Sequence, residues 1–246
     1  VELWNKAFEQ AGYLKAIEAV DFPTADKAFD PDNISFSCIR YVPSASEKVS
    51  SAFMANPQTG EIINATVLVY NDVVNTIDNW RLVQTAQLDP AARAAQMPDS
   101  IVEQTLEYII AHEVGHTLGF MHNMAASAAI PTDSLRSPTF TRRHGTTASI
   151  MDYARFNYVA QPSDRGVRLT PPQLGVYDFY AVEWAYRLFR GSKGYEDDAK
   201  QLRNLVGKHE GDPFYRYGLQ QTNTRYDPSA IEEDLSNDPI KAGDYL

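Results

Sequence analysis

The chain has 246 residues, which is enough for one sizeable hydrophobic core or two small ones. A hydrophobic share of 43% and a charged share of 22% are typical of a folded domain and exclude wholesale disorder and a collagen-like chain. The 22 basic and 32 acidic residues give a net charge of -10, which disfavours nucleic acid or an anionic membrane as the main partner because either would need a basic face. No apolar run approaches the roughly 18–20 residues that span a bilayer. The single cysteine, Cys38, excludes an internal disulfide.

Apolar residues recur at helical spacing from the third residue onward, and the pattern predicts a helix that ends at Gly12. Its apolar face consists of Leu3, Trp4, Ala7, Phe8 and Ala11. No convincing helix cap precedes this pattern, and no charged-then-apolar signal peptide follows Val1. We therefore expect the chain to be a fragment of a longer protein that begins inside a helix, and the alternative is a short helix that frays at a natural terminus.

Runs rich in β-branched and aromatic residues predict a sheet. The predicted strands are residues 34–42, 51–55 and 62–70. Between the last two, the sequence NPQTG has the proline and glycine typical of a hairpin turn. Residues 14–20 fit either a strand or a helix. Cys38 fits a small buried side chain of the first strand better than a reactive thiol.

Three later segments predict helices, the first over residues 71–88. The strongest helix signal follows it: Ser100 and Glu103 match a capping box, a broad apolar stripe runs onward, and Gly119 ends the helix. Another helix is predicted directly after residues 170–173 (TPPQ), which match a helix cap with proline at the first position. We expect its many aromatic side chains to pack on the core, with stacking on a cofactor as the alternative.

The segment HEVGHTLGFMH carries three of the five histidines in the chain. His112 and His116 are four residues apart on a predicted helix, so both rings project from one side and can take two corners of a zinc tetrahedron. Gly119 can leave the helix through a positive φ, which lets the chain reverse and bring His122 to a third corner. Glu113 then lies beside the metal, where the general base for a zinc-bound water belongs. The sequence therefore predicts one catalytic Zn²⁺ with three histidine ligands and Glu113 as the catalytic base.

This segment resembles the H-E-x-x-H-x-x-G-x-x-H signature of the metzincin clan of zinc peptidases, and residues 149–153 (SIMDY) resemble the methionine turn of that clan. By this resemblance Met151 is the turn residue beneath the metal. Tyr153 is then implied to ligate zinc or to donate a hydrogen bond to the developing oxyanion. The segment after Tyr153 is implied to form one wall of the pocket for the residue that follows the scissile bond.

Four stretches resemble a family of large bacterial zinc-dependent metalloproteases. They are WNKAFEQAG (4–12), PQTGEI (57–62), HNMAAS (122–127) and SIMDYARFNY (149–158). The resemblance implies an α+β metzincin catalytic domain over residues 1–190, with a twisted, mostly parallel sheet, one antiparallel edge strand, an active-site helix, a methionine turn and a C-terminal helix. The first strand of the clan has no counterpart before Trp4, so the domain is expected to be truncated at its N-terminus. Residues 191–246 are expected to form an extension of unknown role.

The resemblance also implies a function, that of a zinc-dependent metalloendopeptidase acting on peptide or protein substrates. It implies a secreted or cell-envelope location and a longer multidomain parent. In the clan, an antiparallel edge strand binds extended substrate by strand addition. The candidate residues here are Ser51, Ala52, Phe53, Met54 and Ala55. A hairpin with no substrate role is the alternative.

Charged residues in the second half of the chain leave alternatives open. Between residues 123 and 170 there are three aspartates and six arginines, at positions 136, 142, 143, 155, 165 and 168. This local excess fits arginines paired with surface acids, and the alternative is a cleft that prefers acidic peptides. We expect His144 to be a surface residue rather than a substrate contact. The acidic residues 227–246 are expected to form a solvated tail rather than a calcium site.

Two other functions fit parts of the motif. A catalytically inactive, zinc-stabilised peptide-binding module would keep the three histidines but would have no need of Glu113. A gluzincin would use a distant glutamate, such as Glu183, as its third ligand, which the position of His122 disfavours.

Overall fold

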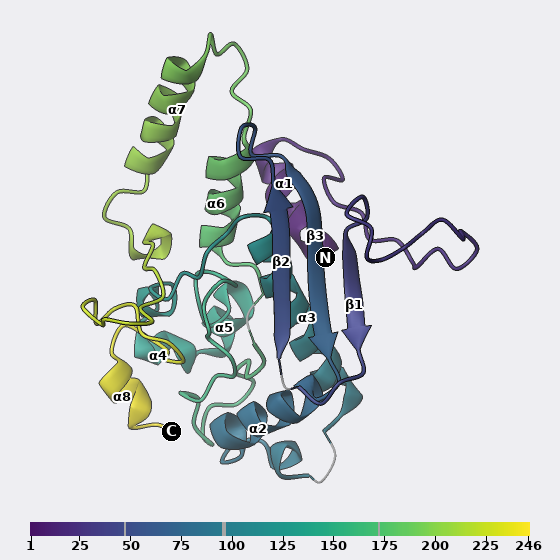
Figure 1. The fold of residues 1–246 in the computed structure, drawn as a ribbon. Coiled ribbons are helices and arrows are strands. Elements are labelled where there is room, and N and C mark those ends of the chain that lie inside the picture. The colour runs from purple at the N-terminus through teal and green to yellow at the C-terminus, as the bar shows by residue number, and fades with distance from the viewer. Residues whose placement is uncertain (47, 95–96, 172) are drawn as a thin grey trace. The chain divides into compact units, whose positions relative to one another are not determined.

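The computed structural model describes residues 1–46, 48–94, 97–171 and 173–246. The chain forms a mixed α+β structure (Figure 1) that divides into two compact units. The first unit contains Val1 and Ala19–Met121, and the second contains Glu2–Glu18 and His122–Leu246. The boundary expected at residue 190 stays a prediction.

The β structure of the first unit is a three-stranded sheet. Its strands are β1 (Cys38–Val42), β2 (Val49–Ala55) and β3 (Ile62–Tyr70). The strand order is β1-β3-β2, with β1 parallel to β3 and β2 antiparallel to it. β2 therefore lies at an edge of the sheet (Figure 1), in agreement with the predicted hairpin and antiparallel edge strand. With one parallel and one antiparallel pair, this small sheet is mixed rather than mostly parallel.

β1 begins four residues later than the sequence pattern predicts. The Asn64 side chain on β3 donates to the Phe36 carbonyl at 2.9 Å, and the Ser37 hydroxyl accepts from the Ala65 backbone N–H at 3.1 Å. These side-chain hydrogen bonds stand in for backbone pairing, which starts at Cys38. Cys38 itself is half-buried, and its thiol donates to the Phe36 carbonyl at 3.7 Å, so it serves as a small packed side chain.

The helices of the first unit are α2 (Val73–Thr85), a 3-10 turn η2 (Pro90–Arg93) and α3 (Asp99–Thr117). α3 packs against β2 and β3, and it buries Tyr108, Ile109, Ala111 and Val114. The predicted capping box is wrong: α3 begins at Asp99, Ser100 lies inside its first turn, and no side chain caps it. Its end agrees with the prediction, because Gly119 has a φ of +89°.

The second unit consists of short helices joined by loops. They are η1 (Glu2–Trp4), α1 (Asn5–Ala11), η3 (Ser127–Ala129), α4 (Thr132–Leu135), α5 (Pro138–His144), α6 (Val176–Tyr186), α7 (Tyr195–Gly207), η4 (Pro213–Tyr215) and α8 (Pro239–Gly243). α1 packs on α6, where Phe8 meets Tyr186 at a ring separation of 5.1 Å, and Gly12 ends α1 with a φ of +102°. The first predicted helix is therefore confirmed. Among the described residues, no helix has both the length and the apolar character that crossing a membrane requires.

Residues 14–20 form neither the strand nor the helix that their pattern allows. Asn5 Oδ1 accepts from the backbone N–H of Ile17 at 2.9 Å, and Asn5 Nδ2 donates to the carbonyl of the same residue at 2.7 Å. One side chain on α1 thus satisfies both backbone groups of Ile17 in place of a regular hydrogen-bond ladder.

α6 begins at Val176 rather than directly after residues 170–173. Pro172, which belongs to the predicted cap, lies outside the described residues. The helix is capped instead by Asp178, whose carboxylate accepts from the Gly175 backbone N–H at 2.7 Å. A Cβ on Gly175 would lie 2.0 Å from the carbonyl oxygen of Ala148, so only glycine permits this close approach of the two backbones.

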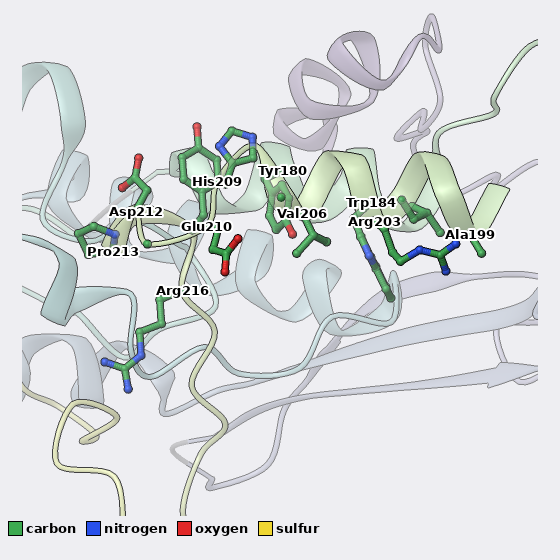
Figure 2. A pocket seen from close by; sticks show the side chains of 14 residues that line it. Tyr180, Trp184, Ala199, Arg203, Val206, His209, Glu210, Asp212, Pro213 and Arg216 are labelled. Carbon is green, nitrogen blue, oxygen red and sulfur yellow. The ribbon is translucent and has the colours of Figure 1, made fainter. Parts of the chain in front are cut away.

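A cavity of about 930 Å³ lies among α6, α7 and η4 (Figure 2). Its walls include Tyr180 and Trp184 of α6, and the ring of His209 stacks on Tyr215 at 3.7 Å. The aromatic residues of α6 are expected to pack on the core. Tyr186 does so by contacting Phe8, whereas Tyr180 and Trp184 line the cavity. Cofactor stacking there stays a prediction, and none of the predicted metal ligands lines the cavity.

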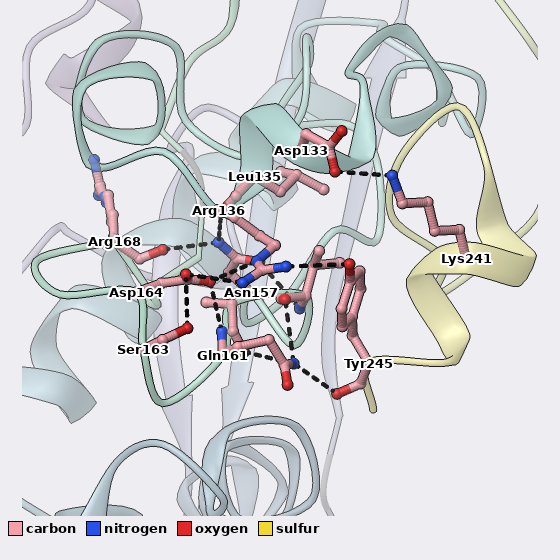
Figure 3. Close-up of polar contacts among 12 residues, drawn as sticks. Asp133, Leu135, Arg136, Asn157, Gln161, Ser163, Asp164, Arg168, Lys241 and Tyr245 are labelled. Carbon is pink, nitrogen blue, oxygen red and sulfur yellow. Dashed lines mark hydrogen bonds and ion pairs between the residues drawn. The ribbon is translucent and has the colours of Figure 1, made fainter.

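The C-terminal residues are packed rather than solvated, so the predicted solvated tail is wrong. Leu235 and Ala242 are buried in one apolar cluster of the second unit. Tyr245 is hydrogen-bonded through both its side chain and its backbone (Figure 3). Its hydroxyl accepts from the Arg136 guanidinium at 3.1 Å, and its backbone carbonyl accepts from Gln161 Nε2 at 3.0 Å. The apolar residues that lie between the acids bury surface, which the count of charges alone did not reveal.

Candidate metal centre

The three histidines of the HEVGHTLGFMH segment meet. His112 and His116 project from the last turns of α3, and the positive φ of Gly119 turns the chain out of the helix before His122. One potential ligand nitrogen of each ring lies within 4.8 Å of the other two. Within the part of the chain that the structure describes, no second group of three or more His, Cys, Asp or Glu side chains meets in this way. The structure thus brings together the three residues predicted as zinc ligands.

Two of these rings have their Nδ1 atoms fixed by oxygen acceptors. His116 Nδ1 lies 2.8 Å from the backbone carbonyl oxygen of Phe120, and His122 Nδ1 lies 2.7 Å from Oε1 of Gln220. A carbonyl oxygen only accepts, so each Nδ1 carries a proton, and in the neutral form of each ring the lone pair is on Nε2. Neutral imidazoles held in this way are typical zinc ligands. The chemistry of the donor set therefore fits Zn²⁺.

Glu113 follows His112 on α3 and is close enough to His116 to feel its charge, but it does not belong to the group of three histidines. Ser51 on β2 donates from its hydroxyl to Glu113 Oε2 at 2.5 Å. Burial raises the pKa of Glu113, while the hydrogen bond from Ser51 and the nearby His116 act to lower it. The carboxyl group is therefore fixed in orientation and has a higher proton affinity than usual, and both properties suit a group that takes up a proton.

The segment predicted as the methionine turn is buried beside the residues that follow His122. Met151 is 2% exposed, and its carbonyl accepts from the Asn123 backbone N–H at 3.0 Å. The ring of Tyr153 lies edge-on to the ring of His122, with their centroids 4.7 Å apart. The predicted turn residue and the predicted oxyanion partner are thus both attached to the segment that carries the third histidine.

A buried aspartate on α6, which the sequence analysis missed, holds one side of this turn. Asp178 accepts from the Ser149 hydroxyl at 2.6 Å, from the Ile150 backbone N–H at 2.8 Å and from Gly175. Burial raises the pKa of Asp178 to about 7, although the three hydrogen bonds act to lower it. The side chain thus joins the start of α6 to the turn before Met151.

Asp152 holds the other side of the turn. It accepts from the Ser127 backbone N–H at 2.6 Å and from the Tyr153 backbone N–H at 2.7 Å. Burial raises its pKa to about 7, and the nearby Asp234 adds to the effect. Ser127 also donates from its hydroxyl to Asp234 at 3.3 Å, so the C-terminal segment is connected to the turn through one serine.

A second missed feature is a segment near the C-terminus that runs alongside the residues after His122. Asn123 binds it twice, by accepting from the Gly218 N–H at 2.9 Å and donating to the Arg216 carbonyl at 3.0 Å. The Met124 N–H donates to the Gly218 carbonyl at 2.8 Å. No local pattern marks these residues, because their partners lie more than 90 positions earlier in the chain.

The residues predicted to bind substrate all belong to the edge strand β2. Phe53 and Met54 are 47% and 53% exposed, and Ser51 contacts Glu113. The strand thus presents side chains to solvent and lies in the same unit as the predicted base. Substrate contact by this strand stays a prediction.

The arginine-rich region shows the pairing that we expected of a surface. Arg136 pairs with Asp164 at 2.7 Å, and Arg155 pairs with Glu233. His144 is exposed at the last turn of α5, in line with a surface histidine. Arg136 and Arg155 therefore meet acids of the chain itself, while a preference for acidic peptides stays a prediction.

The fold and the site together define a class of protein. This mixed α+β chain has a helix that carries H-E-x-x-H, a third histidine after a glycine turn, and a buried turn at Met151. Together these features are the arrangement of a zincin. A family model for Met-zincins matches residues 94–246, more than half of the chain, and the chain belongs to this family. The match includes residues 191–246 as well as the histidine segment. No curated protein and no solved structure matches the chain.

Two substitutions at Asp178 test its part in holding the turn. Its pKa, about 7 in the folded protein, lies above the ordinary value of 3.8, so its contribution to the free energy of unfolding is greatest below pH 4 and is lost as the pH rises towards 7. Asp178→Asn can still accept two hydrogen bonds and can donate one to Ser149, so the variant should fold. Because asparagine does not titrate, the variant should lose the pH dependence that Asp178 gives to the free energy of unfolding, a slope of up to about 1.4 kcal/mol per pH unit. Asp178→Leu should cost about 1–3 kcal/mol for each buried donor left unpaired.

Urea unfolding between pH 4 and 8 provides the measurement. The exposed Asp244→Asn serves as the control, and it should leave the pH profile as in the original chain. Identical pH profiles for Asp178→Asn and the original chain would show that Asp178 does not titrate as stated.

Proposed function

We propose that the protein is a zinc-dependent metalloendopeptidase that cleaves peptide or protein substrates, with His112, His116 and His122 as the metal ligands. The observation that carries this proposal is the meeting of three imidazole rings, with ligand atoms within 4.8 Å of one another, beside a carboxyl group outside the set. Structural zinc sites usually have four protein ligands, whereas catalytic sites have three and keep one position open. Membership of the Met-zincin family supports the same activity.

Glu113 is the general base in this proposal. When bound, Zn²⁺ supplies a Lewis acid for the scissile carbonyl and makes water more acidic. Ser51 holds Oε2 of Glu113, so the other carboxylate oxygen is the one that takes the proton of the attacking water. The same carboxyl group then donates this proton to the nitrogen of the leaving amine. A raised pKa serves both steps, because it brings the proton affinity of the group closer to neutral pH.

Tyr153 is the proposed oxyanion partner. Its ring packs on His122, and Arg155 lies over its face at 5.0 Å from the ring centroid. A phenol held beside a metal ligand can donate a hydrogen bond to the oxygen that becomes negative when the carbonyl is attacked.

β2 is the proposed binding strand for extended substrate. An edge strand offers backbone N–H and C=O groups to a peptide that lies beside it. The hydrogen bond from Ser51 to Glu113 places this strand next to the proposed base, which supports its role over that of a hairpin without function.

The alternatives have less support. In a zinc-stabilised binding module without catalysis, there is no reason for a carboxyl group beside the ligands to be fixed by a donor on a neighbouring strand. The gluzincin alternative needs Glu183 as a ligand, yet Glu183 of α6 pairs with Arg187, the residue directly after that helix. Zinc-edge absorption separates three nitrogen ligands from two nitrogens and a carboxylate.

We also propose an extracytoplasmic location and a longer parent protein, on the basis of the resemblance to large bacterial zinc-dependent metalloproteases. Fractionation of cells that make the protein, followed with an antibody to this chain, tests the location. Recovery in the cytoplasm alone would contradict it.

Substitution of Glu113 separates catalysis from metal binding. Glu113→Ala should still bind one zinc ion, because the three histidines are unchanged, but kcat/KM should fall by about 10²–10⁴ with the loss of the base. The measurement is cleavage of a mixed peptide library with and without chelator, read by mass spectrometry, together with zinc content. Loss of zinc in this variant would make Glu113 a ligand, and full activity would remove it from the mechanism.

Tyr153→Phe tests the oxyanion partner. The ring and its packing on His122 remain, so the free energy of unfolding should change little, whereas loss of the hydroxyl should lower kcat by about 10²–10³. Steady-state kinetics and thermal unfolding are measured side by side. An unchanged kcat would show that the residue only packs.

Substrate strand addition is tested with backbone-methylated peptides. Because alternate residues of an added strand point their N–H groups at the enzyme, N-methylation of those residues should lower kcat/KM by roughly tenfold per hydrogen bond lost. The matched control carries the methyl group one residue along the peptide, where the N–H points away. Equal effects of the two peptides would count against β2 as the binding strand.

A further inference from the structure

The side chain of Gln220 reaches a predicted metal ligand from 98 positions later in the chain, with Oε1 2.7 Å from His122 Nδ1. We propose that Gln220 is a positioning residue for the third ligand, and that the segment around it is a working part of the metal centre. This inference rests on the three-histidine site of the proposed function, but it concerns how the third ring is held rather than what the enzyme cleaves.

His122 needs an external hold more than the other two ligands do. His112 and His116 are carried by α3, whose backbone hydrogen bonds fix their positions, and His116 is further bonded to Phe120. His122 follows the reversal at Gly119 and lies on a non-helical segment. A ring on such a segment has no helix to set its direction, so its direction depends on the groups that bind its other edge.

Gln220 supplies the hydrogen bond that this ring requires. Oε1 is an acceptor only, so His122 donates from Nδ1 and leaves the lone pair on Nε2 for the metal. If the acceptor is removed, the neutral ring can place its proton on either nitrogen, and the form with Nε2–H cannot bind a metal through Nε2. The bond therefore selects the ligating tautomer as well as the direction of the ring.

The backbone around Gln220 is fixed by contacts with the residues that follow His122, so the Gln220 side chain can set the direction of the His122 ring. Gly218 is bonded to Asn123 and Met124, the two residues after His122. A Cβ on Gly218 would lie 2.6 Å from the Cβ of Ala125, so the two segments approach as closely as glycine allows. The segment is thus fixed on the residues next to the ligand.

The neighbouring Gln221 anchors the other side of the segment. It is 8% exposed and uses both ends of its amide, donating to the carbonyls of Asp227 and Ala230 at 2.7 and 2.9 Å. Its Oε1 accepts from the backbone N–H groups of Tyr226 and Asp227 at 2.8 Å. Of two consecutive glutamines, one therefore holds its own loop while the other points to His122.

The first test is the zinc affinity of the purified chain, measured by competition with a chromophoric chelator. Gln220→Leu should weaken zinc binding by roughly 10–100-fold, the usual effect of losing an outer partner of a histidine ligand. Gln220→Glu keeps an acceptor and should bind zinc at least as tightly as the original chain, because a carboxylate is the stronger partner for Nδ1–H. Thr222→Ala, an exposed site two residues away, is the control and should have no effect.

The second test needs neither metal nor activity. Nitrogen-15 spectra of the histidine rings in the zinc-free protein report which nitrogen carries the proton. The His122 ring should be the Nδ1–H form in the original chain and in Gln220→Glu, and a mixture of both forms in Gln220→Leu. Thermal unfolding of the zinc-free variants, measured alongside, should be unchanged, which separates a positioning role from a general loss of folding.

The outcomes distinguish this inference from the proposed function. Zinc affinity and ring tautomer that are unchanged in Gln220→Leu would overturn it, even if the protein cleaves peptides. A weaker zinc affinity with a mixed tautomer would support it, even if no peptide is cleaved. If Gln220→Glu binds zinc as weakly as Gln220→Leu, an acceptor at this position is not what matters and the inference is wrong.

Discussion

The metal centre depends on one constraint: a ring that is not on the helix must be brought to the two rings that are. α3 can present two histidines on one face, but a third residue on that face would lie a further helical turn away from the first two. Gly119 solves the backbone part of this problem, because its φ of +89° lets the chain leave the helix within a single residue. The remaining part is the direction of the third side chain, and the residues that follow His122 are hydrogen-bonded to several segments that are distant in the sequence. Asn123 alone binds Met151, Arg216 and Gly218.

Buried carboxyl groups, rather than apolar packing alone, hold the methionine turn. Asp178 and Asp152 are both fully buried in the protein interior, and each accepts several hydrogen bonds from the turn or its surroundings. A tight turn has backbone N–H groups that no helix or strand can satisfy, so acceptors must reach it from outside. The raised pKa of each aspartate reflects the cost of burial, and the hydrogen bonds offset part of this cost. The gain is a turn whose position is set by directional bonds, and the proposed oxyanion partner Tyr153 lies two residues after Met151 of this turn.

Sequence patterns predicted the parts of the fold that depend on neighbours in the chain. The histidine spacing, the reversal at Gly119, the hairpin of β2 and β3 and the first helix all follow from periodicity or from single residues with special backbone freedom. Ser100 shows the limit of such reasoning, since a matching capping box lies inside the helix rather than at its start. Asp178 and Gln220 could not be predicted, because nothing near them in the sequence indicates that their partners lie 28 and 98 positions away. The packing of residues 227–246 was missed for a related reason. Most of the sequence signal there is charge, and the few apolar residues that bury surface, such as Leu235 and Ala242, lie between the acids.

The proposed role of Gln220 connects the metal centre to the packing of the C-terminal residues. A hydrogen bond between residues 98 positions apart closes a long loop, and it can form only when the tail is already in place. The tail is kept in place by the burial of Leu235 and by the bonds of Gln221, neither of which is close to the chemistry. Linkage is reciprocal. If an ordered Gln220 strengthens zinc binding by a given free energy, bound zinc stabilises the packed tail by the same amount. On this proposal, zinc binding is coupled to the folding of residues far beyond the histidine segment, and the C-terminal region is a working part of the metal centre rather than an appendage to it.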